Sequence, residues 1–243
     1  MGNIEQGLNT YSLYLLVFGS ILLIVFALVS LKIKKLDPEN KKLLYLAIII
    51  SAIIPTLALS FSTVYLNVVS SSGGPVHWHA DFEVWNCGQK INLKDPKGFS
   101  NRIGTRTLHE HGDDRIHLEG LVITPTDANL SNFFRVVGGD LTTSSVSMPI
   151  NDGTFSIKNG DTCASATDPK LQVFAYKTDK DNYYSQKKIE NPADYIISAE
   201  SNVPPADCII IEYDTSKAKT DKLCRSYKVA QKIGKLKGEK NGN

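Results

Sequence analysis

The sequence predicts a two-helix transmembrane hairpin followed by a mainly β (β-rich α+β) domain with one short helix outside the membrane. Three observations support this prediction: two long uncharged apolar runs, a lysine-rich segment between them, and a following region of short alternating or β-branched runs separated by turn signals. The averages of the 243-residue chain hide this division, because 42% hydrophobic residues, 21% charged residues and a net charge of +2 are values of an ordinary soluble protein. The near-neutral charge also argues against nucleic acid as a partner.

The predicted hairpin comprises residues 1–69, with spans at 11–31 and 43–64 that contain no charged residue. At about 1.5 Å per residue, each run is long enough to cross a hydrocarbon core of roughly 30 Å, so the lipid bilayer is the expected partner. The first ten residues contain no Lys or Arg, and the first run is longer than a signal-peptide core, so both spans are expected to be retained. Both runs are apolar on every face, which argues against two buried core helices.

The segment between the spans, residues 32–42, sets the expected orientation. It reads KIKKLDPENKK and holds five lysines against Asp37 and Glu39. Short loops rich in Lys stay in the cytoplasm, so the N-terminus and the domain after the second span are both predicted to lie outside the plasma membrane.

The cysteines agree with this orientation, because all four follow the second span: Cys87, Cys163, Cys208 and Cys224. Disulfides persist in the extracytoplasmic compartment, so two disulfides are expected, with free buried thiols as the alternative. Three pairings are possible, and the spacing does not choose among them.

After a flexible tether at 70–74, the β-rich domain is predicted to span residues 75–216. Its strand candidates are VHWHADFEVW, RTLHEH, IHLEGLVI, TFSIKNG, LQVFAYK, ADYIIS and DCIIIEYD. The segment 126–139 predicts a helix, with Asp127 as N-cap, an apolar face that includes Phe133 and Phe134, and a stop at two glycines.

The C-terminal segment 217–243 is strongly basic. One interpretation is a solvated tail. The sharper interpretation is a basic arm that contacts anionic lipid headgroups or wall polymers through Lys228, Lys232, Lys235 and Lys237.

All five histidines fall within a short window of the predicted domain: His77, His79, His109, His111 and His117. Side chains alternate faces along a strand, so His77, His79, Asp81 and Glu83 are expected on one face, and the intervening Val76, Trp78, Phe82 and Val84 on the core face. A five-residue turn GDDRI would place His111 opposite His117 and His109 opposite Glu119.

This pattern predicts a metal site. The candidate ligands are the five histidines, with Glu119 and Asp81 as oxygen ligands, and Asp113, Asp114 and Glu110 are either turn residues or groups that orient the imidazoles. The window holds no Met and no clear thiolate ligand, which favours Cu(II) or Zn(II) over Cu(I). A pH-sensitive histidine cluster without metal is the alternative.

Five motifs carry a family resemblance: HWHADFEVWNCG, LHEHGDDRIHLEG, LSNFFRVVGG, IKNG and DCIIIEY. They resemble an uncharacterised prokaryotic family of membrane-anchored proteins whose pattern runs HxHxxxxxxxxG, LHxHDxxGxIHxE, LxxFFxVxG, NG and DxIxIxY. The resemblance implies the same architecture and histidine cluster and names no reaction. The chain departs from the pattern at His111–Gly112 and Asp114–Arg115, which affects the hairpin turn.

Two weaker resemblances concern parts of the chain. The late NG and DxIxIxY elements are similar to the end of a β-grasp subdomain. HWHADFE is similar to the first cupin motif, with Glu83 four residues after His79, although the second cupin motif is not recognisable.

Three functions are compatible with these features. The first is a membrane-anchored, extracytoplasmic protein that binds copper or zinc for acquisition, buffering or delivery to another membrane protein. The second is a metal-dependent hydrolase or oxidoreductase in which Glu110 or Glu119 acts as general base on a bound water. The third is a surface interaction module stapled by a structural metal. The sequence names neither catalytic residues nor an oligomeric state.

Overall fold

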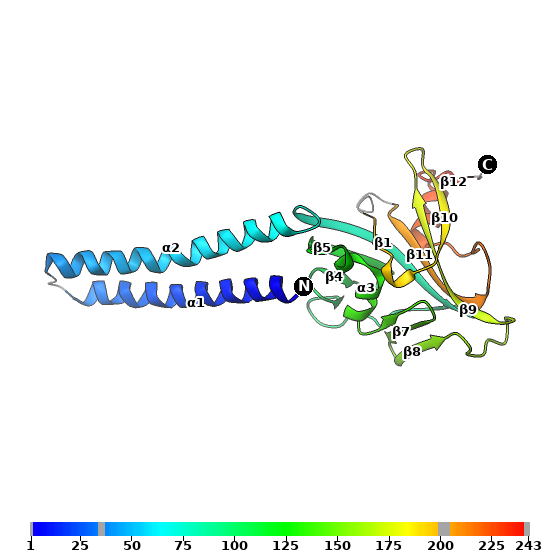
Figure 1. Cartoon of the computed structure of the whole chain (residues 1–243), viewed down its shortest axis with the longest axis horizontal. Coiled ribbons are helices and arrows are strands. Elements are labelled where there is room, and N and C mark those ends of the chain that lie inside the picture. Colours follow the sequence, from blue (N-terminus) through cyan, green and yellow to red (C-terminus); the bar gives the residue numbers. More distant parts are fainter. Residues whose placement is uncertain (1, 34–36, 199–204, 241–243) are drawn as a thin grey trace. The chain divides into compact units, whose positions relative to one another are not determined.

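The computed structural model describes residues 2–33, 37–198 and 205–240, and divides the chain into two compact units, Met1–Gly74 and Pro75–Asn243. The first unit is a helical hairpin and the second is mainly β, with a short helix where the sequence predicts one (Figure 1). This confirms the predicted fold class.

The hairpin consists of α1 (Gly2–Lys32) and α2 (Pro38–Val69), which include both predicted spans. The two helices are long and apolar enough to cross a membrane. The carboxylate of Asp37 caps α2 by accepting a hydrogen bond from the backbone N of Asn40 at 3.1 Å.

Small residues bring the two helices into close contact. A Cβ atom on Gly19 would lie 2.4 Å from Cγ of Pro55, so only glycine fits at this crossing. The hydroxyl groups of Ser12 and Ser62 lie 2.9 Å apart across the same interface. Close approach at small residues and hydroxyl contacts are typical of membrane helix pairs.

The second unit is built on a nine-stranded sheet over the described residues. Eight strands follow the order β12-β10-β9-β11-β1-β5-β4-β3, and β2 pairs with β1. The strands are β1 (Pro75–Asn86), β2 (Gln89–Ile91), β3 (Ile103–Gly104), β4 (Leu108–Glu110), β5 (Arg115–Leu121), β9 (Pro169–Thr178), β10 (Tyr183–Ile189), β11 (Asp207–Thr215) and β12 (Gly238–Glu239). A small second sheet consists of β6 (Asp140–Leu141), β7 (Ser145–Ile150) and β8 (Gly153–Lys158).

The centre of the main sheet is a parallel pair formed by the first and last long strands. β1 pairs with β11, with Ala80 opposite Asp207, and each is flanked by an antiparallel neighbour, β5 or β9. The antiparallel strands β1 and β5, the helix α3 (Leu130–Val136) and the later strands β9 and β11 thus produce the order β5-β1-β11-β9, which resembles β-grasp connectivity. The β-grasp-like element therefore uses both ends of the domain, whereas the sequence pointed only to its late part.

The apolar core on one face of the sheet lies under α3. Phe82 of β1 packs edge-on against Phe133 of α3, with ring centroids 5.1 Å apart. Ala80, Val84 and the alternate residues of β5 and β11 are buried in the same cluster. This is the core face that the alternation along β1 predicts.

The helix α3 starts later than the sequence pattern predicts. Its N-cap is Asn129, which accepts a hydrogen bond from the backbone N of Asn132 at 2.8 Å. Asp127 instead belongs to the preceding 3-10 turn η1 (Pro125–Ala128), where its carboxylate accepts from the backbone N of Thr124. The predicted strand ADYIIS is wrong in part, because it begins inside a second 3-10 turn, η2 (Pro192–Asp194), and contributes one isolated bridge.

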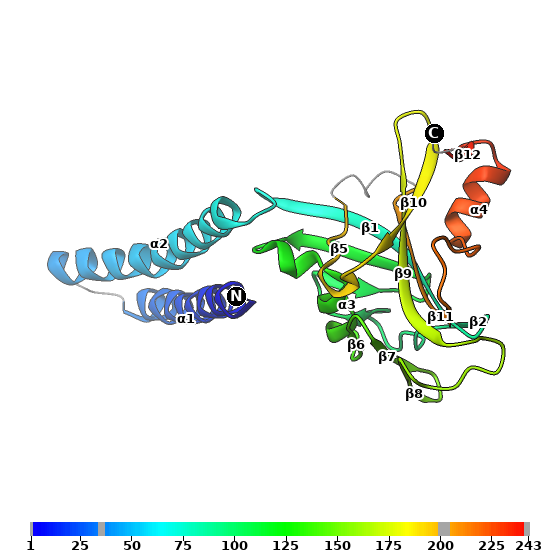
Figure 2. The ribbon, with the colours of Figure 1, turned by 45° about the vertical axis from the view of Figure 1, so that its right-hand side comes forward.

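The opposite face of the sheet is covered by a helix that the sequence pattern did not predict, α4 (Arg225–Lys232) (Figure 2). Tyr227 and Ala230 of α4 and the following Leu236 are buried against β9, β10 and β11. Residues of the segment 217–240 are therefore packed against the β-rich domain. Lys228, Lys232, Lys235 and Lys237 remain exposed, so their contact with lipid or wall polymer stays a prediction.

Two disulfides join these elements, as expected. Cys87 pairs with Cys163, and Cys208 of β11 pairs with Cys224, the residue before α4. No cysteine in the described part of the chain is free.

Candidate metal centre

Three histidines form one row across three neighbouring antiparallel strands. His79 of β1 lies opposite His117 of β5, and His117 lies opposite His109 of β4. Residues in one such row point to the same face of a sheet, about 5 Å apart. The central position of β5 gives His117 a histidine neighbour on each side.

His77 and His111 lie beside this row. His77 is two residues before His79 on β1, and His111 is two residues after His109, just past the end of β4. Ring centroids are 4.6 Å apart for His77 and His79, 4.8 Å for His79 and His117, and 4.7 Å for His109 and His111. His117 also lies 4.8 Å from His111 and 5.5 Å from His109. The five predicted histidines thus form one continuous array.

Within this array, two groups of three histidines have nitrogen atoms close enough to bind one metal ion. One group is His77, His79 and His117, and the other is His109, His111 and His117. In each group the three candidate nitrogen atoms lie within 4.8 Å of one another. Both groups include His117.

The protonation of His111 is fixed by its surroundings. Its Nδ1 lies 2.5 Å from the backbone oxygen of Asn101, and a carbonyl only accepts, so Nδ1 carries the proton. The lone pair of Nε2 then faces Nε2 of His109, 3.0 Å away. Metal-binding histidines commonly donate their second N–H to a backbone carbonyl in this way.

His109 is the most buried of the five, with 2% of its surface exposed. Its Nδ1 has no hydrogen-bond partner among the described residues. Burial together with the neighbouring His111 lowers the pKa of His109. A buried neutral imidazole with an unsatisfied nitrogen is unfavourable by itself, and such groups commonly mark a functional site.

Burial, together with the neighbouring His117 and His77, lowers the pKa of His79 to about 4. His79 therefore stays neutral at neutral pH. Neutral imidazole is the form that binds metal ions.

The backbone beside His109 depends on a glycine. Gly104 of β3 lies opposite His109, and its φ of +112° falls in a region that favours glycine. A Cβ at this position would lie 2.6 Å from the backbone oxygen of Leu108. Gly104 therefore lets β3 approach the strand that carries His109.

Two carboxylates contact the array. Oε1 of Glu119 lies 3.0 Å from Nε2 of His77, and Oδ2 of Asp113 lies 3.3 Å from Nε2 of His117. Glu119 is a predicted oxygen ligand. Asp113 is the acid that the sequence left as either a turn residue or an orienting group, and in the structure it is in the turn and also contacts a histidine.

The predicted strand register around this turn is wrong by two residues. The expected five-residue turn would pair His111 with His117, whereas the structure pairs His109 with His117. The turn takes its shape from Glu110, whose Oε1 accepts hydrogen bonds from the backbone N of Asp113 at 2.7 Å and of Asp114 at 3.1 Å. The shift moves β4 by two residues relative to His117, so the histidines keep the same face.

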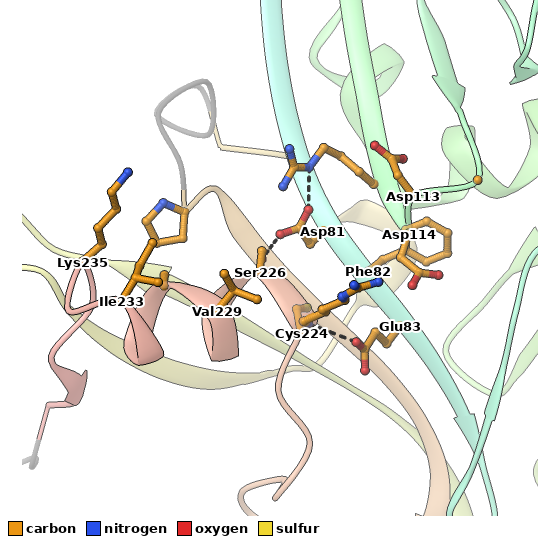
Figure 3. A pocket seen from close by; sticks show the side chains of 15 residues that line it. Asp81, Phe82, Glu83, Asp113, Asp114, Cys224, Ser226, Val229, Ile233 and Lys235 are labelled. Carbon is orange, nitrogen blue, oxygen red and sulfur yellow. Dashed lines mark hydrogen bonds and ion pairs between the residues drawn. The ribbon is translucent and has the colours of Figure 1, made fainter.

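Asp81 shares the face of the histidines and is engaged elsewhere, so we do not retain it as a ligand. Its carboxylate accepts a hydrogen bond from Nε of Arg115 at 2.6 Å and another from the hydroxyl of Ser226 (Figure 3). Glu83, the next residue on this face, accepts from the backbone N of Arg225 at 3.2 Å and thereby caps α4. The acidic half of β1 therefore anchors the helix.

A pocket of about 560 Å³ lies between this half of β1, the β4–β5 turn and α4 (Figure 3). Its lining includes Asp81, Glu83, Asp113, Arg115, Arg225 and Val229. None of the five histidines, all within the described part of the chain, lines it. Asp113 connects the pocket to the array through its contact with His117.

Comparison of the chain with protein-family models, with curated proteins and with solved structures finds no match. The assignment of function therefore depends on the site itself.

Proposed function

We propose that this chain is a membrane-anchored, extracytoplasmic metal-binding protein that acquires, buffers or delivers copper or zinc. The observation that carries the proposal is the array of five imidazoles, in which two groups of three have nitrogen atoms within 4.8 Å of one another. A shared metal site would account for the row of three histidines across three neighbouring strands.

The donor atoms favour Cu(II) or Zn(II). Imidazole nitrogens with nearby carboxylate oxygens suit these ions, whereas Cu(I) prefers thiolates and thioethers. The four cysteines are consumed in disulfides, and both methionines of the chain, Met1 and Met148, lie outside the histidine window.

The extracytoplasmic location is supported by two independent features. The loop between the helices carries five lysines, which favours the cytoplasmic side for that loop. Both disulfides lie in the second unit, which is consistent with an oxidising compartment for the domain. Delivery implies a second membrane protein as partner.

The experiment that tests the proposal measures metal content. The full chain, purified in detergent, stripped with chelator and reloaded with Zn(II) or Cu(II), is expected to retain at least one ion per chain after desalting. The His109→Ala/His111→Ala variant is expected to lose a large part of this metal, and Asp152→Ala, which removes an exposed acid in the β7–β8 turn, serves as the control. Retention of less than about a third of an ion, unchanged in the histidine variant, would reject the proposal.

A metal-dependent enzyme is the second candidate, favoured by the pocket that adjoins the array through Asp113. A catalytic ion needs a coordination position open to substrate. Azide added to the Cu(II)-loaded chain is expected to change the visible and EPR spectra if such a position exists. An unchanged spectrum would reject the enzyme candidate and leave metal binding as the proposed function.

A further inference from the structure

The position of His117 between the two histidine groups points to a pair of metal ions. We propose that the array binds two ions at once and that the imidazole of His117 bridges them, with one ring nitrogen for each ion. This inference rests on the proposed metal-binding function and goes beyond it, because a five-histidine array could equally hold a single ion.

The topology makes His117 the shared ligand. It lies on the middle strand of three, with His79 opposite on β1 and His109 opposite on β4. The ring contacts reach His79 on one side, at 4.8 Å, and His111 and His109 on the other, at 4.8 and 5.5 Å. An imidazole has two nitrogen atoms on different edges of its ring, so one ring can serve both groups.

Two carboxylates beside the array offer further donors, one next to His77 and one next to the shared His117. Glu119 lies 3.0 Å from Nε2 of His77, and Asp113 lies 3.3 Å from Nε2 of His117. In a tetrahedral site with bonds of about 2.0–2.1 Å, neighbouring ligand atoms are about 3.4 Å apart. The two contacts and the 3.0 Å separation of the His109 and His111 nitrogens are close to this edge length. Three imidazoles and one carboxylate would complete four ligands for each ion.

The charges of such a pair are largely balanced. Two divalent ions bring four positive charges, and Glu119 and Asp113 supply two negative ones. When both nitrogens of His117 bind metal, its N–H proton leaves to solvent and the ring becomes an imidazolate anion. One positive charge then remains, which is acceptable at a site whose outer members are partly exposed, as the 63% exposed side chain of His77 is.

The test is a Cu(II) titration of the full chain in detergent, with metal content measured after desalting and EPR spectra recorded at each step. Two Cu(II) per chain are expected, and the EPR intensity should fall below that of two isolated ions when the second ion binds, because an imidazolate couples their spins. His79→Ala should bind one Cu(II) with a full uncoupled signal, and so should His111→Ala, which removes the other group.

His117→Gln should abolish the coupling, and circular dichroism of each variant reports whether the domain is folded. If His117→Gln fails to fold, His79→Ala and His111→Ala, each of which removes a ligand from one group, still decide the test. One Cu(II) per wild-type chain, or two with a full uncoupled signal, would overturn the inference and leave the metal-binding function in place. No retained metal would overturn both.

Discussion

Nε2 of His109 and Nε2 of His111 lie 3.0 Å apart, and the other nitrogen of His111 donates to the backbone of Asn101. Because Nδ1 of His111 carries the proton, its Nε2 accepts, and Nε2–H of His109 donates to it. The geometry depends on the turn that follows, and the turn depends on Glu110. This dependence gives the first prediction.

Glu110→Ala is expected to loosen the β4–β5 turn, because Oε1 of Glu110 accepts the backbone N–H groups of Asp113 and Asp114. Loss of hydrogen bonds to a charged acceptor costs about 2 kcal/mol of unfolding free energy. Removal of groups that orient ligands lowers metal affinity by about 10–100-fold. Isothermal titration with Zn(II) checks this, with Glu110→Gln, which keeps one acceptor oxygen, as the milder control. Equal affinity of Glu110→Ala and wild type would contradict the assigned role.

Gly104→Ala is expected to destabilise the domain by about 2–3 kcal/mol, because the new Cβ meets the backbone oxygen of Leu108 and the φ of +112° is strained for alanine. Gly98→Ala is the matched control, since Gly98 also has a positive φ, +87°, and a Cβ added there would meet no atom within 4 Å. Urea unfolding followed by tryptophan fluorescence measures both, because the two tryptophans, Trp78 and Trp85, lie in β1. A Gly98→Ala effect as large as that of Gly104→Ala would show that contact with Leu108 is not the cause.

The two disulfides are expected to contribute unequally to stability. Cys87 and Cys163 are 76 residues apart, and Cys208 and Cys224 are 16 apart. The chain-entropy relation gives losses of about 4.5 and about 3 kcal/mol when each pair is replaced by alanine. The urea midpoint should therefore be lower for the variant without Cys87–Cys163 than for the variant without Cys208–Cys224. The reverse order would indicate that anchoring α4, which follows Cys224, matters more than loop length.

The metal-free protein is expected to lose stability as the pH falls from about 6.5 to about 4. Burial and the neighbouring His117 and His77 lower the pKa of His79 to about 4, whereas in the unfolded chain it has its usual pKa of about 6.5. Between these values the unfolded chain binds more protons, so this contribution is fully present above pH 6.5 and disappears as the pH falls through 4. Urea midpoints measured across this range should decline less steeply in His79→Gln. An identical slope in both proteins would refute the assignment to His79.

The orientation of the chain in the membrane can be tested directly in cells. An epitope tag at the C-terminus should be removed by protease added to intact cells, whereas a tag inserted in residues 32–42 should be protected. Replacing the five lysines of this loop by glutamine should reduce the orientation bias. Protection of the C-terminal tag in the wild-type chain would place the domain in the cytoplasm.

Features that follow a regular hydrophobic or alternating sequence pattern were predictable from the sequence. Both long helices follow from uncharged runs, and the shared face of His77, His79, His109 and His117 follows from the alternation of side chains along strands. The helix at Leu130–Val136 was expected from its apolar spacing, although its cap was not.

Features that depend on specific side-chain contacts were not predictable. The register of His109 with His117 is set by the contact of Glu110 with two backbone amides. The helix α4 carries few apolar residues. It is held by Glu83 of β1, which is remote in sequence, and by the disulfide between Cys224 and Cys208 of β11. Asp81 was expected to bind metal because it shares the histidine face, and Arg115 engages it instead.

The central parallel pair has a consequence for the order in which the domain folds. The histidine array lies on β1, β5 and β4, which pair with one another within residues 75–121. The other edge of β1 is closed by β11, whose Asp207 pairs with Ala80. Because the chain is synthesised from its N-terminus, the histidine strands are available before β11, while this edge of β1 is still open. Pairing over such a sequence distance is slow, so a metal ion bound early would hold the hairpin in register until the last strand arrives.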